Sequence, residues 1–145
     1  MRLTSPAFDY GRRLPVRYTA DAPAGEVSPP LRVDGLPEGT LSLTLLMEDP
    51  DVAGGTWLHW LLFDLPPVGE IPEGATGLGV PGVNSWRRIG YGGPAPPSGI
   101  HRYLFRVFAL TDTLRLPERS TRREVEEAMG GRLLAEAALL ARYGV

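Results

Sequence analysis

The chain has 145 residues, 43% of them hydrophobic, and a formal net charge of -2 at pH 7. This length fits one ordinary domain with a buried core, so we expect a single domain over residues 1–145. The slight negative charge gives no long-range attraction for nucleic acid or for an anionic membrane surface, and neither is an expected partner. The absence of cysteine excludes disulfides, thiolate nucleophiles and thiolate metal sites.

The start of the chain lacks the apolar core of a signal peptide, and no stretch approaches the roughly 20 apolar residues of a membrane span. We therefore expect a cytoplasmic protein without an integral membrane segment. Heat-labile side chains are scarce: Asn84 is the only asparagine, and glutamine and cysteine are absent. Thermostability and a codon bias explain this composition equally well.

Glycine and proline cluster between apolar runs, which is typical of short strands joined by turns. The strands predicted most strongly are Leu41–Met47, Trp57–Leu65 and Arg102–Leu110. In the second run, strict alternation would place His59 with Trp57 and Leu61 on one face, and Trp60 with Leu58 on the other. Because both faces are apolar, we expect central strands covered on both sides, as in a β-sandwich.

Helices are predicted only near the C-terminal end. Thr121 precedes Glu124 at the spacing of a capping box, which starts a short helix that ends at Gly130-Gly131. An apolar stripe over Arg132–Tyr143 predicts a second helix, with Gly144 as its terminator. We expect this second helix to pack against the sheet.

The chain has two histidines, and the first lies in an apolar strand just after the acidic segment 48–51, which we predict to be a turn. A buried imidazole is costly without a partner, and Asp49 is a candidate partner for His59. Such a carboxylate would favour the imidazolium and raise the pKa of His59. A core histidine that is satisfied structurally remains the alternative.

The second histidine follows the loop 90–99, which holds four glycines and three prolines. Glycine backbone in this loop can come close to a ligand, and its N–H groups can face an anion. Alternation then places His101 and Tyr103 on one face of the next strand, while Arg102 points to the other face and is a candidate for a buried ion pair. A plain long turn is the alternative interpretation.

Two other kinds of site stay open. A metal site could use both histidines with Asp49 or Asp51, although no short ligand motif supports it. A hydrolase could pair Ser85 or Ser98 with a histidine and an aspartate, but the sequence has no Gly-x-Ser-x-Gly elbow. We therefore predict neither a metal nor another cofactor.

Taken together, several segments resemble the phosphatidylethanolamine-binding protein family, in particular its small bacterial and archaeal Raf-kinase-inhibitor-like branch. The segments that carry this resemblance span nearly the whole chain. They are Leu3-Thr4-Ser5-Pro6-Ala7-Phe8, Ser28-Pro29-Pro30-Leu31, Asp49-Pro50-Asp51, His59-Trp60, Gly90-Tyr91-Gly92-Gly93-Pro94, Pro96-Pro97-Ser98-Gly99-Ile100-His101-Arg102-Tyr103, Leu134-Ala135-Glu136-Ala137 and Tyr143-Gly144. Three segments depart from the family's usual residues: Val52-Ala53 replaces Ala-Pro, Ala95 replaces a frequent cysteine, and the rim near Val83 and Arg87 differs.

The resemblance implies a mainly β fold, a β-sandwich with a large central antiparallel sheet, a smaller sheet and short C-terminal helices. It also implies a pocket for phosphate and phosphoryl head groups. The residues that it assigns to this pocket are Asp49, Asp51, His59, Gly93, Pro94, His101 and Tyr103.

We therefore expect a small soluble binding protein for an anionic ligand rather than an enzyme, with a kinase-inhibitor-like regulator as a related role. A protein partner or a homodimer, with a contact near 84–88, stays open. The alternative from another class is a hydrolase of a small phosphorylated or acyl substrate, with His59 or His101 as general base.

Overall fold

The computed structural model describes residues 1–145 and contains two antiparallel sheets and one short α-helix. The smaller sheet has the strand order β1-β2-β5, and the larger one has the order β6-β4-β3-β7-β8. The elements are β1 (Arg2–Thr4), the 3-10 helix η1 (Val16–Tyr18), β2 (Leu31–Asp34), β3 (Ser42–Val52), β4 (Gly55–Leu65), β5 (Glu70–Ile71), β6 (Val80–Pro81), β7 (Ile100–Leu110), α1 (Arg122–Met129) and β8 (Leu133–Gly144).

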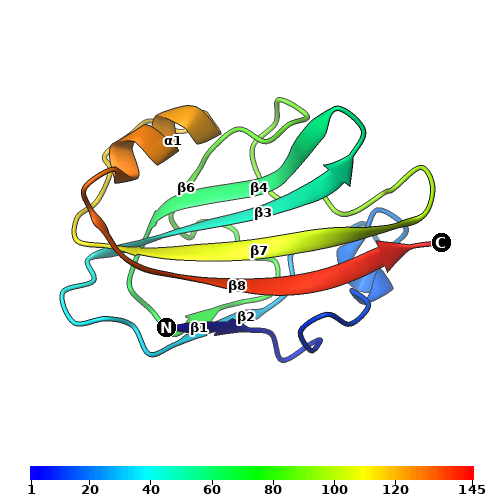
Figure 1. The fold of residues 1–145 in the computed structure, drawn as a ribbon, viewed down its shortest axis with the longest axis horizontal. Helices are drawn as coiled ribbons and strands as arrows, with labels where there is room; N and C mark the ends of the chain where they lie inside the picture. The colour runs from blue at the N-terminus through cyan, green and yellow to red at the C-terminus, as the bar shows by residue number, and fades with distance from the viewer.

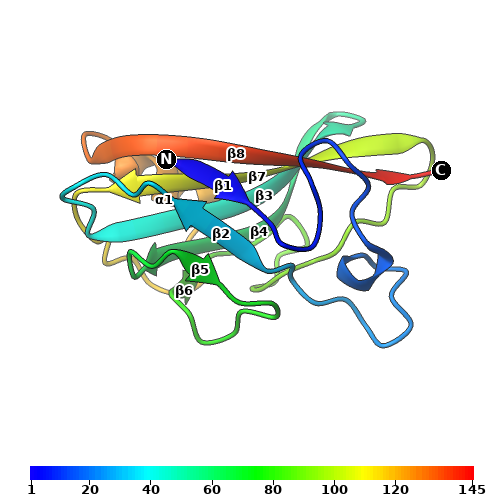
Figure 2. The same ribbon diagram turned by 90° about the horizontal axis from the view of Figure 1, so that it is seen from below.

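The smaller sheet is layered against one face of the larger sheet (Figures 1 and 2). The space between them is filled by the main core, to which Leu31 of β2, Trp60 of β4 and Phe105 of β7 contribute fully buried side chains. A second apolar cluster covers the other face of the larger sheet, where Val125 and Met129 of α1 are buried. Both faces of the central strands are therefore covered, and the predicted β-sandwich with its two unequal sheets is confirmed.

The three predicted strands are present and are longer than the sequence indicated. The segment 48–51, which we expected to be a turn, belongs to β3, and the chain reverses only after Val52. Glu48 and Asp49 remain paired with β4 on one side, and Glu48 also pairs with β7 on the other. This pairing carries the two carboxylates into the sheet rather than into solvent.

The predicted first helix is confirmed as α1. Thr121 accepts a hydrogen bond from the Glu124 backbone N–H, and the Glu124 side chain accepts one from the Thr121 N–H, which is a complete capping box.

The prediction of a second helix over Arg132–Tyr143 was wrong, because this segment is β8, the edge strand that pairs with β7 over nearly its whole length. Its C-terminal half alternates with period two, and Leu139, Ala141 and Tyr143 face the main core. Burial of this alternating face and a continuous ladder with β7 outweigh the helix propensity of alanine and leucine.

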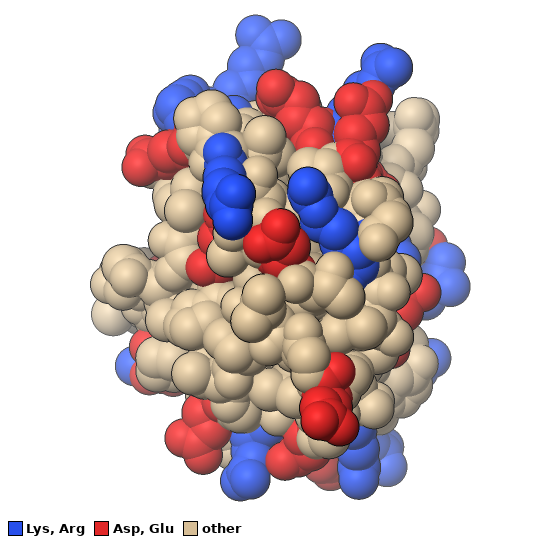
Figure 3. Space-filling model, turned by 90° about the vertical axis from the view of Figure 1, so that its left-hand side faces the viewer, with Lys and Arg blue, Asp and Glu red and all other residues tan.

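The tip of the β3–β4 hairpin and the start of β7 lie at one end of the molecule, and α1 lies toward the other end (Figure 1). At the α1 end, acidic and basic side chains are interspersed and do not gather by sign (Figure 3). Two ion pairs lie along α1 itself, Arg122 with Glu126 and Arg123 with Glu127. No helix of the structure is long and apolar enough to cross a membrane.

Candidate functional site

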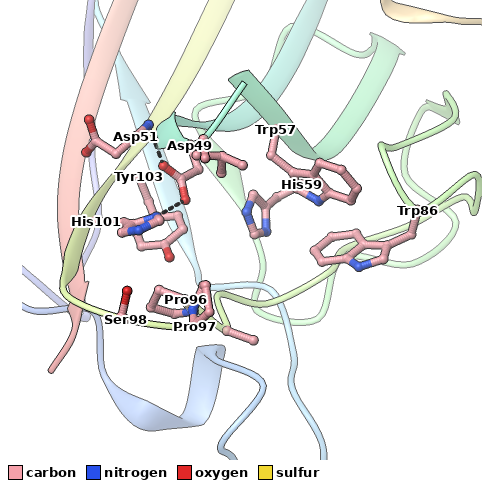
Figure 4. Close-up of a pocket in the computed structure, with 13 residues that line it drawn as sticks. Asp49, Asp51, Trp57, His59, Trp86, Pro96, Pro97, Ser98, His101 and Tyr103 are labelled. Carbon is pink, nitrogen blue, oxygen red and sulfur yellow. Dashed lines mark hydrogen bonds and ion pairs between the residues drawn. The ribbon is translucent and has the colours of Figure 1, made fainter. Parts of the chain in front are cut away.

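A cavity of about 440 Å³ opens at the hairpin end, between the β3–β4 hairpin, the start of β7 and the loop before β7. Its volume falls in the usual range for sites that bind small molecules. Side chains from these three segments, and Trp86 from a further loop, converge on it (Figure 4). The lining residues are Asp49, Asp51, Val52, Ala53, Trp57, His59, Trp86, Ala95, Pro96, Pro97, Ser98, His101 and Tyr103.

Asp49 and His101 form the most buried polar pair of this cavity. His101 Nδ1 lies 2.6 Å from Asp49 Oδ2, and the exposed fractions of the two side chains are 14% and 3%. The other carboxylate oxygen of Asp49 accepts the Asp51 backbone N–H at 2.8 Å. Because an ionised carboxylate can only accept, Nδ1 of His101 carries the proton. Asp49 thus fixes the ring of His101 rather than that of His59, which corrects the expected pairing.

His59 is held by backbone instead. Its Nδ1 lies 2.7 Å from the Gly92 carbonyl oxygen, and its own carbonyl accepts the Gly92 N–H at 3.1 Å. A carbonyl accepts only, so Nδ1 of His59 is also the protonated nitrogen. The Nε2 atoms of both imidazoles make no hydrogen bond within the chain. The only fully enclosed side-chain polar atom without a hydrogen-bond partner is Thr44 Oγ1. The two unpaired Nε2 atoms therefore keep some access to open space.

A β-bulge explains the position of His59. Met47 pairs with Trp60 and Glu48 pairs with Leu58, so His59 is the extra residue of β4 at this point. The bulge breaks the strict alternation that the sequence suggested: Leu58 packs in the cluster beneath α1, while Trp60 packs in the main core. The extra residue allows the imidazole to reach both Gly92 and the cavity.

Burial lowers the pKa of His59, although the Gly92 carbonyl and the Asp49 carboxylate both raise it. The expectation of a raised pKa for His59 was therefore wrong, because burial outweighs both the Gly92 carbonyl and the Asp49 carboxylate. Neutral His59 presents the lone pair of Nε2 to the cavity. Burial, followed by the neighbouring Asp49 carboxylate, raises the pKa of Tyr103, so that its phenol stays protonated at neutral pH.

Asp51 lies at the outer edge of the cavity and pairs with Arg102. The guanidinium donates to both carboxylate oxygens, at 2.7 Å and 3.0 Å, and the Arg102 backbone N–H adds a bond of 2.8 Å. These hydrogen bonds lower the pKa of Asp51 to about 2. The pair is exposed, with 56% of the Arg102 side chain accessible, so the expectation of a buried ion pair for Arg102 was wrong.

Two tryptophans form an aromatic wall that the list of predicted site residues lacks. The rings of Trp57 and Trp86 meet edge to face at 5.5 Å, and Trp86 also contacts the His59 ring at 5.0 Å. Trp57 precedes His59 by two residues in β4, so alternation already predicted a shared face. Trp86 comes from a separate loop, next to the rim that the family resemblance indicated near Val83 and Arg87, but Trp86 itself was not predicted as a site residue.

The loop before β7 contributes to the cavity, but not through the residues expected. Ala95, Pro96, Pro97 and Ser98 line it, whereas Gly93 and Pro94 do not. The Gly93 N–H donates to Glu26 Oε1 at 3.3 Å, and the Pro94 carbonyl accepts from Ala20 N–H. These two residues anchor the loop to the segment after η1, and their predicted role as ligand contacts stays a prediction.

The metal site and the serine hydrolase, the two other kinds of site that the sequence left open, can be compared with the structure. No group of three or more His, Asp and Glu side chains is arranged to hold a metal ion. The Ser85 hydroxyl is engaged in a structural hydrogen bond, which it accepts from the Leu58 backbone N–H at 2.7 Å. Ser98 lines the cavity, and its hydroxyl is directed toward His101 (Figure 4).

Comparison with known proteins adds to this geometry. The family model of phosphatidylethanolamine-binding protein matches residues 4–144. A UPF0098 protein of Methanothermobacter thermautotrophicus is 41% identical over 155 residues, which cover 99% of this chain and 98% of the relative. A UPF0098 protein of Chlamydia trachomatis is 40% identical over 149 residues, with the same coverage.

Two solved structures are similar over their full length. A phosphatidylethanolamine-binding protein homologue from Chlamydia trachomatis superposes with a TM-score of 0.94 and 39% identity, covering 99% of this chain and 97% of that one. YbcL of Escherichia coli, described as a member of the mammalian family, gives a TM-score of 0.88 and 28% identity, covering 99% and 98%. The chain therefore belongs to the phosphatidylethanolamine-binding protein family.

Proposed function

We propose that the chain binds phosphate and phosphoryl head groups in the cavity lined by Asp49, His59, His101 and Tyr103. The observation that carries this proposal is that two imidazoles converge there, each with Nδ1 held by a partner and Nε2 unpaired. The Tyr103 hydroxyl and the Ser98 hydroxyl provide further polar groups at the same cavity (Figure 4).

The charges of the site determine which form of the ligand it accepts. Asp51 is neutralised by Arg102, but Asp49 leaves a negative charge next to the cavity unless His101 is protonated. An anion bound at Nε2 of His101 stabilises the imidazolium and turns the Asp49–His101 contact into an ion pair. Binding is therefore coupled to proton uptake, and affinity falls as the pH rises.

Neutral His59 plays a complementary part. Its Nε2 lone pair accepts a hydrogen bond, so it matches the hydroxyl of a monoprotonated phosphate or phosphate monoester rather than a bare oxygen. The monoprotonated monoester becomes rarer as the pH rises above about 6, whereas inorganic phosphate keeps a hydroxyl above neutrality. For a phosphate monoester, both histidines therefore favour binding at the acidic side of neutrality.

Isothermal titration with inorganic phosphate and with phosphoethanolamine, at about pH 6 and about pH 8, tests the proposal. A hydrogen bond to a charged group contributes about 1.5–3 kcal/mol, so His101→Ala or His59→Ala should weaken binding at least about tenfold at the lower pH. Arg123→Ala, on α1 at the opposite end, is the control and should leave the affinity unchanged. Equal affinity at both pH values would contradict the role of the imidazolium.

A hydrolase is the second candidate, and the Asp49–His101 pair is the observation that favours it. A carboxylate that fixes Nδ1–H leaves Nε2 as a base, which could take a proton from water or from Ser98 as the oxygen attacks an ester. Release of nitrophenol from nitrophenyl phosphate and nitrophenyl acetate measures this activity. Turnover lost in His101→Ala would support the hydrolase, and turnover at the level of buffer would exclude it for these substrates.

A kinase-inhibitor-like role, through a protein partner at the rim of the cavity, stays a prediction. The exposed Trp86, of which 41% is accessible, belongs to the residue types that are enriched at interfaces.

A further inference from the structure

A second cavity, of about 570 Å³, lies beside β4 and β6 and shares no lining residue with the first. The segment Gly90–Gly93 separates the two: Tyr91 lines the second cavity, while the Gly92 carbonyl holds His59 of the first. The residues that line the second cavity are Glu26, Val27, Ser28, Trp60, Leu62, Gly74, Ala75, Thr76, Gly77, Leu78, Gly79, Pro81, Ile89, Gly90, Tyr91 and Glu118.

The inner surface of this cavity is apolar and rigid. Trp60 and Leu62 of β4 belong to the main core, and the Trp60 and Tyr91 rings meet edge to face at 5.3 Å. The Tyr91 hydroxyl donates to the Tyr18 carbonyl at 2.7 Å, which fixes its ring. Such a surface suits an apolar ligand body and loses little side-chain entropy when it binds one.

The only charged residues of this cavity are two carboxylates. The chain holds 15 basic residues, all arginine, and none of them lines the cavity. Glu118 makes no hydrogen bond or ion pair, and Glu26 accepts only the Gly93 backbone N–H at 3.3 Å. An uncompensated pair of carboxylates beside an apolar surface attracts a cation and repels an anion.

A further polar group points to a ligand. Trp60 is 1% exposed, and its indole N–H makes no hydrogen bond within the chain. Thr44 Oγ1 is the only fully enclosed side-chain polar atom without a partner, so the indole nitrogen must retain some access to open space. The second cavity is the space that Trp60 lines.

We propose that the second cavity is a binding site for a hydrophobic amine. The apolar body of this ligand lies against Trp60 and Tyr91, and its ammonium group lies at the carboxylates of Glu26 and Glu118. An acceptor atom on the body can take the Trp60 indole N–H. This site is independent of the anion site and has the opposite charge preference.

Octylamine, octanol and octanoate test the proposal, because they share one apolar chain and differ only in the charge of the head group. The amine is protonated at about pH 7, since ordinary amines of this kind have a pKa near 10. Nuclear magnetic resonance follows the indole N–H signals, which are assigned through Trp57→Phe and Trp86→Phe. Octylamine should shift the Trp60 signal and bind at least about tenfold more tightly than octanol, which corresponds to about 1.4 kcal/mol.

Carboxylate variants separate charge from packing. Glu118→Gln, and the double variant Glu26→Gln with Glu118→Gln, should reduce the affinity for octylamine toward that for octanol. Glu38→Gln, at an exposed carboxylate outside both cavities, is the matched control and should have no effect. Phosphate titration of the same variants should be unchanged, which distinguishes this site from the anion site. Octanoate binding as tightly as octylamine, no shift of Trp60, or unchanged affinity in the double variant would each overturn the proposal.

Discussion

The two histidines show how the nearest partner decides what an imidazole can do. Both rings lie at the same cavity, and both keep Nδ1–H in a hydrogen bond, but one partner is the Asp49 carboxylate and the other is the Gly92 carbonyl. The partner of His101 is a carboxylate that can balance a positive charge, whereas burial lowers the pKa of His59 despite its hydrogen bond to the Gly92 carbonyl. The site therefore combines one group that can become cationic with one that stays a neutral acceptor.

This difference predicts the titration of His59. Burial lowers its pKa below the ordinary 6.5, so its ring signals should have their midpoint below that value in the folded protein. The folded state then holds fewer protons than the unfolded chain below pH 6.5, and His59 reduces the free energy of unfolding as the pH falls through this value. Nuclear magnetic resonance of the ring C–H groups measures the midpoint, with His101→Ala for assignment. A midpoint above 6.5 would show that the environment of His59 is described incorrectly.

Asp51 predicts a pH effect at lower values. Its pKa is lowered to about 2 from 3.8 by the Arg102 hydrogen bonds, so its contribution to stability is complete above pH 3.8 and disappears as the pH falls toward 2. The variant Asp51→Asn should lose less free energy of unfolding than the unmodified protein as the pH falls from 3.8 to about 2. The contribution is modest because the pair is exposed. Identical acid curves for both proteins would mean that the pair contributes nothing.

At the scale of elements, the α1 capping box could be predicted in full from Thr121, Glu124 and the two glycines, because capping depends on local spacing. Thr121→Ala should reduce the free energy of unfolding by about 1 kcal/mol, measured by chemical denaturation. Glu124→Ala should reduce it less, and the double variant should fall short of the sum, since the two side chains satisfy each other's backbone. Additive effects would indicate that no reciprocal capping exists.

Features that depend on long-range pairing could not be predicted in the same way. The segment Leu133–Gly144 has the composition of a helix, and only its ladder with β7 makes it a strand. The bulge at His59 likewise exists only in the register with β3, where Met47 and Glu48 fix its neighbours. For the same reason Asp49 was assigned to the wrong histidine: closeness in sequence favoured His59, whereas β7 brings His101 within 2.6 Å.

At the scale of the whole molecule, the β-sandwich could be predicted because its central strands are apolar on both faces. The candidate site could be predicted in part. Asp49, Asp51, His59, His101 and Tyr103 all line the cavity, while Gly93 and Pro94 do not. Three residues that depart from the family's usual pattern, Val52, Ala53 and Ala95, also line it. They are the natural places to look for a ligand preference particular to this chain.

The two-layer core predicts where the chain tolerates change. Phe105 is fully buried between the sheets, so Phe105→Ala should cost about 3–5 kcal/mol, a large part of the usual stability of about 5–15 kcal/mol. Ile100 lies on the same strand with 64% of its surface exposed, and Ile100→Ala should change stability by less than about 0.5 kcal/mol. Chemical denaturation of both variants checks this contrast, which comparable losses in the two would contradict.

An anion bound between the two imidazoles would be visible in the nuclear magnetic resonance signals of the rings themselves. The chain contains only two histidines, so a nitrogen-15 imidazole spectrum holds only their signals. Titration with inorganic phosphate at about pH 6 should move the Nε2 resonances of both His59 and His101, with the His101 ring becoming cationic on binding. If saturating phosphate leaves both rings unchanged, the cavity is not an anion site and the proposed function is wrong.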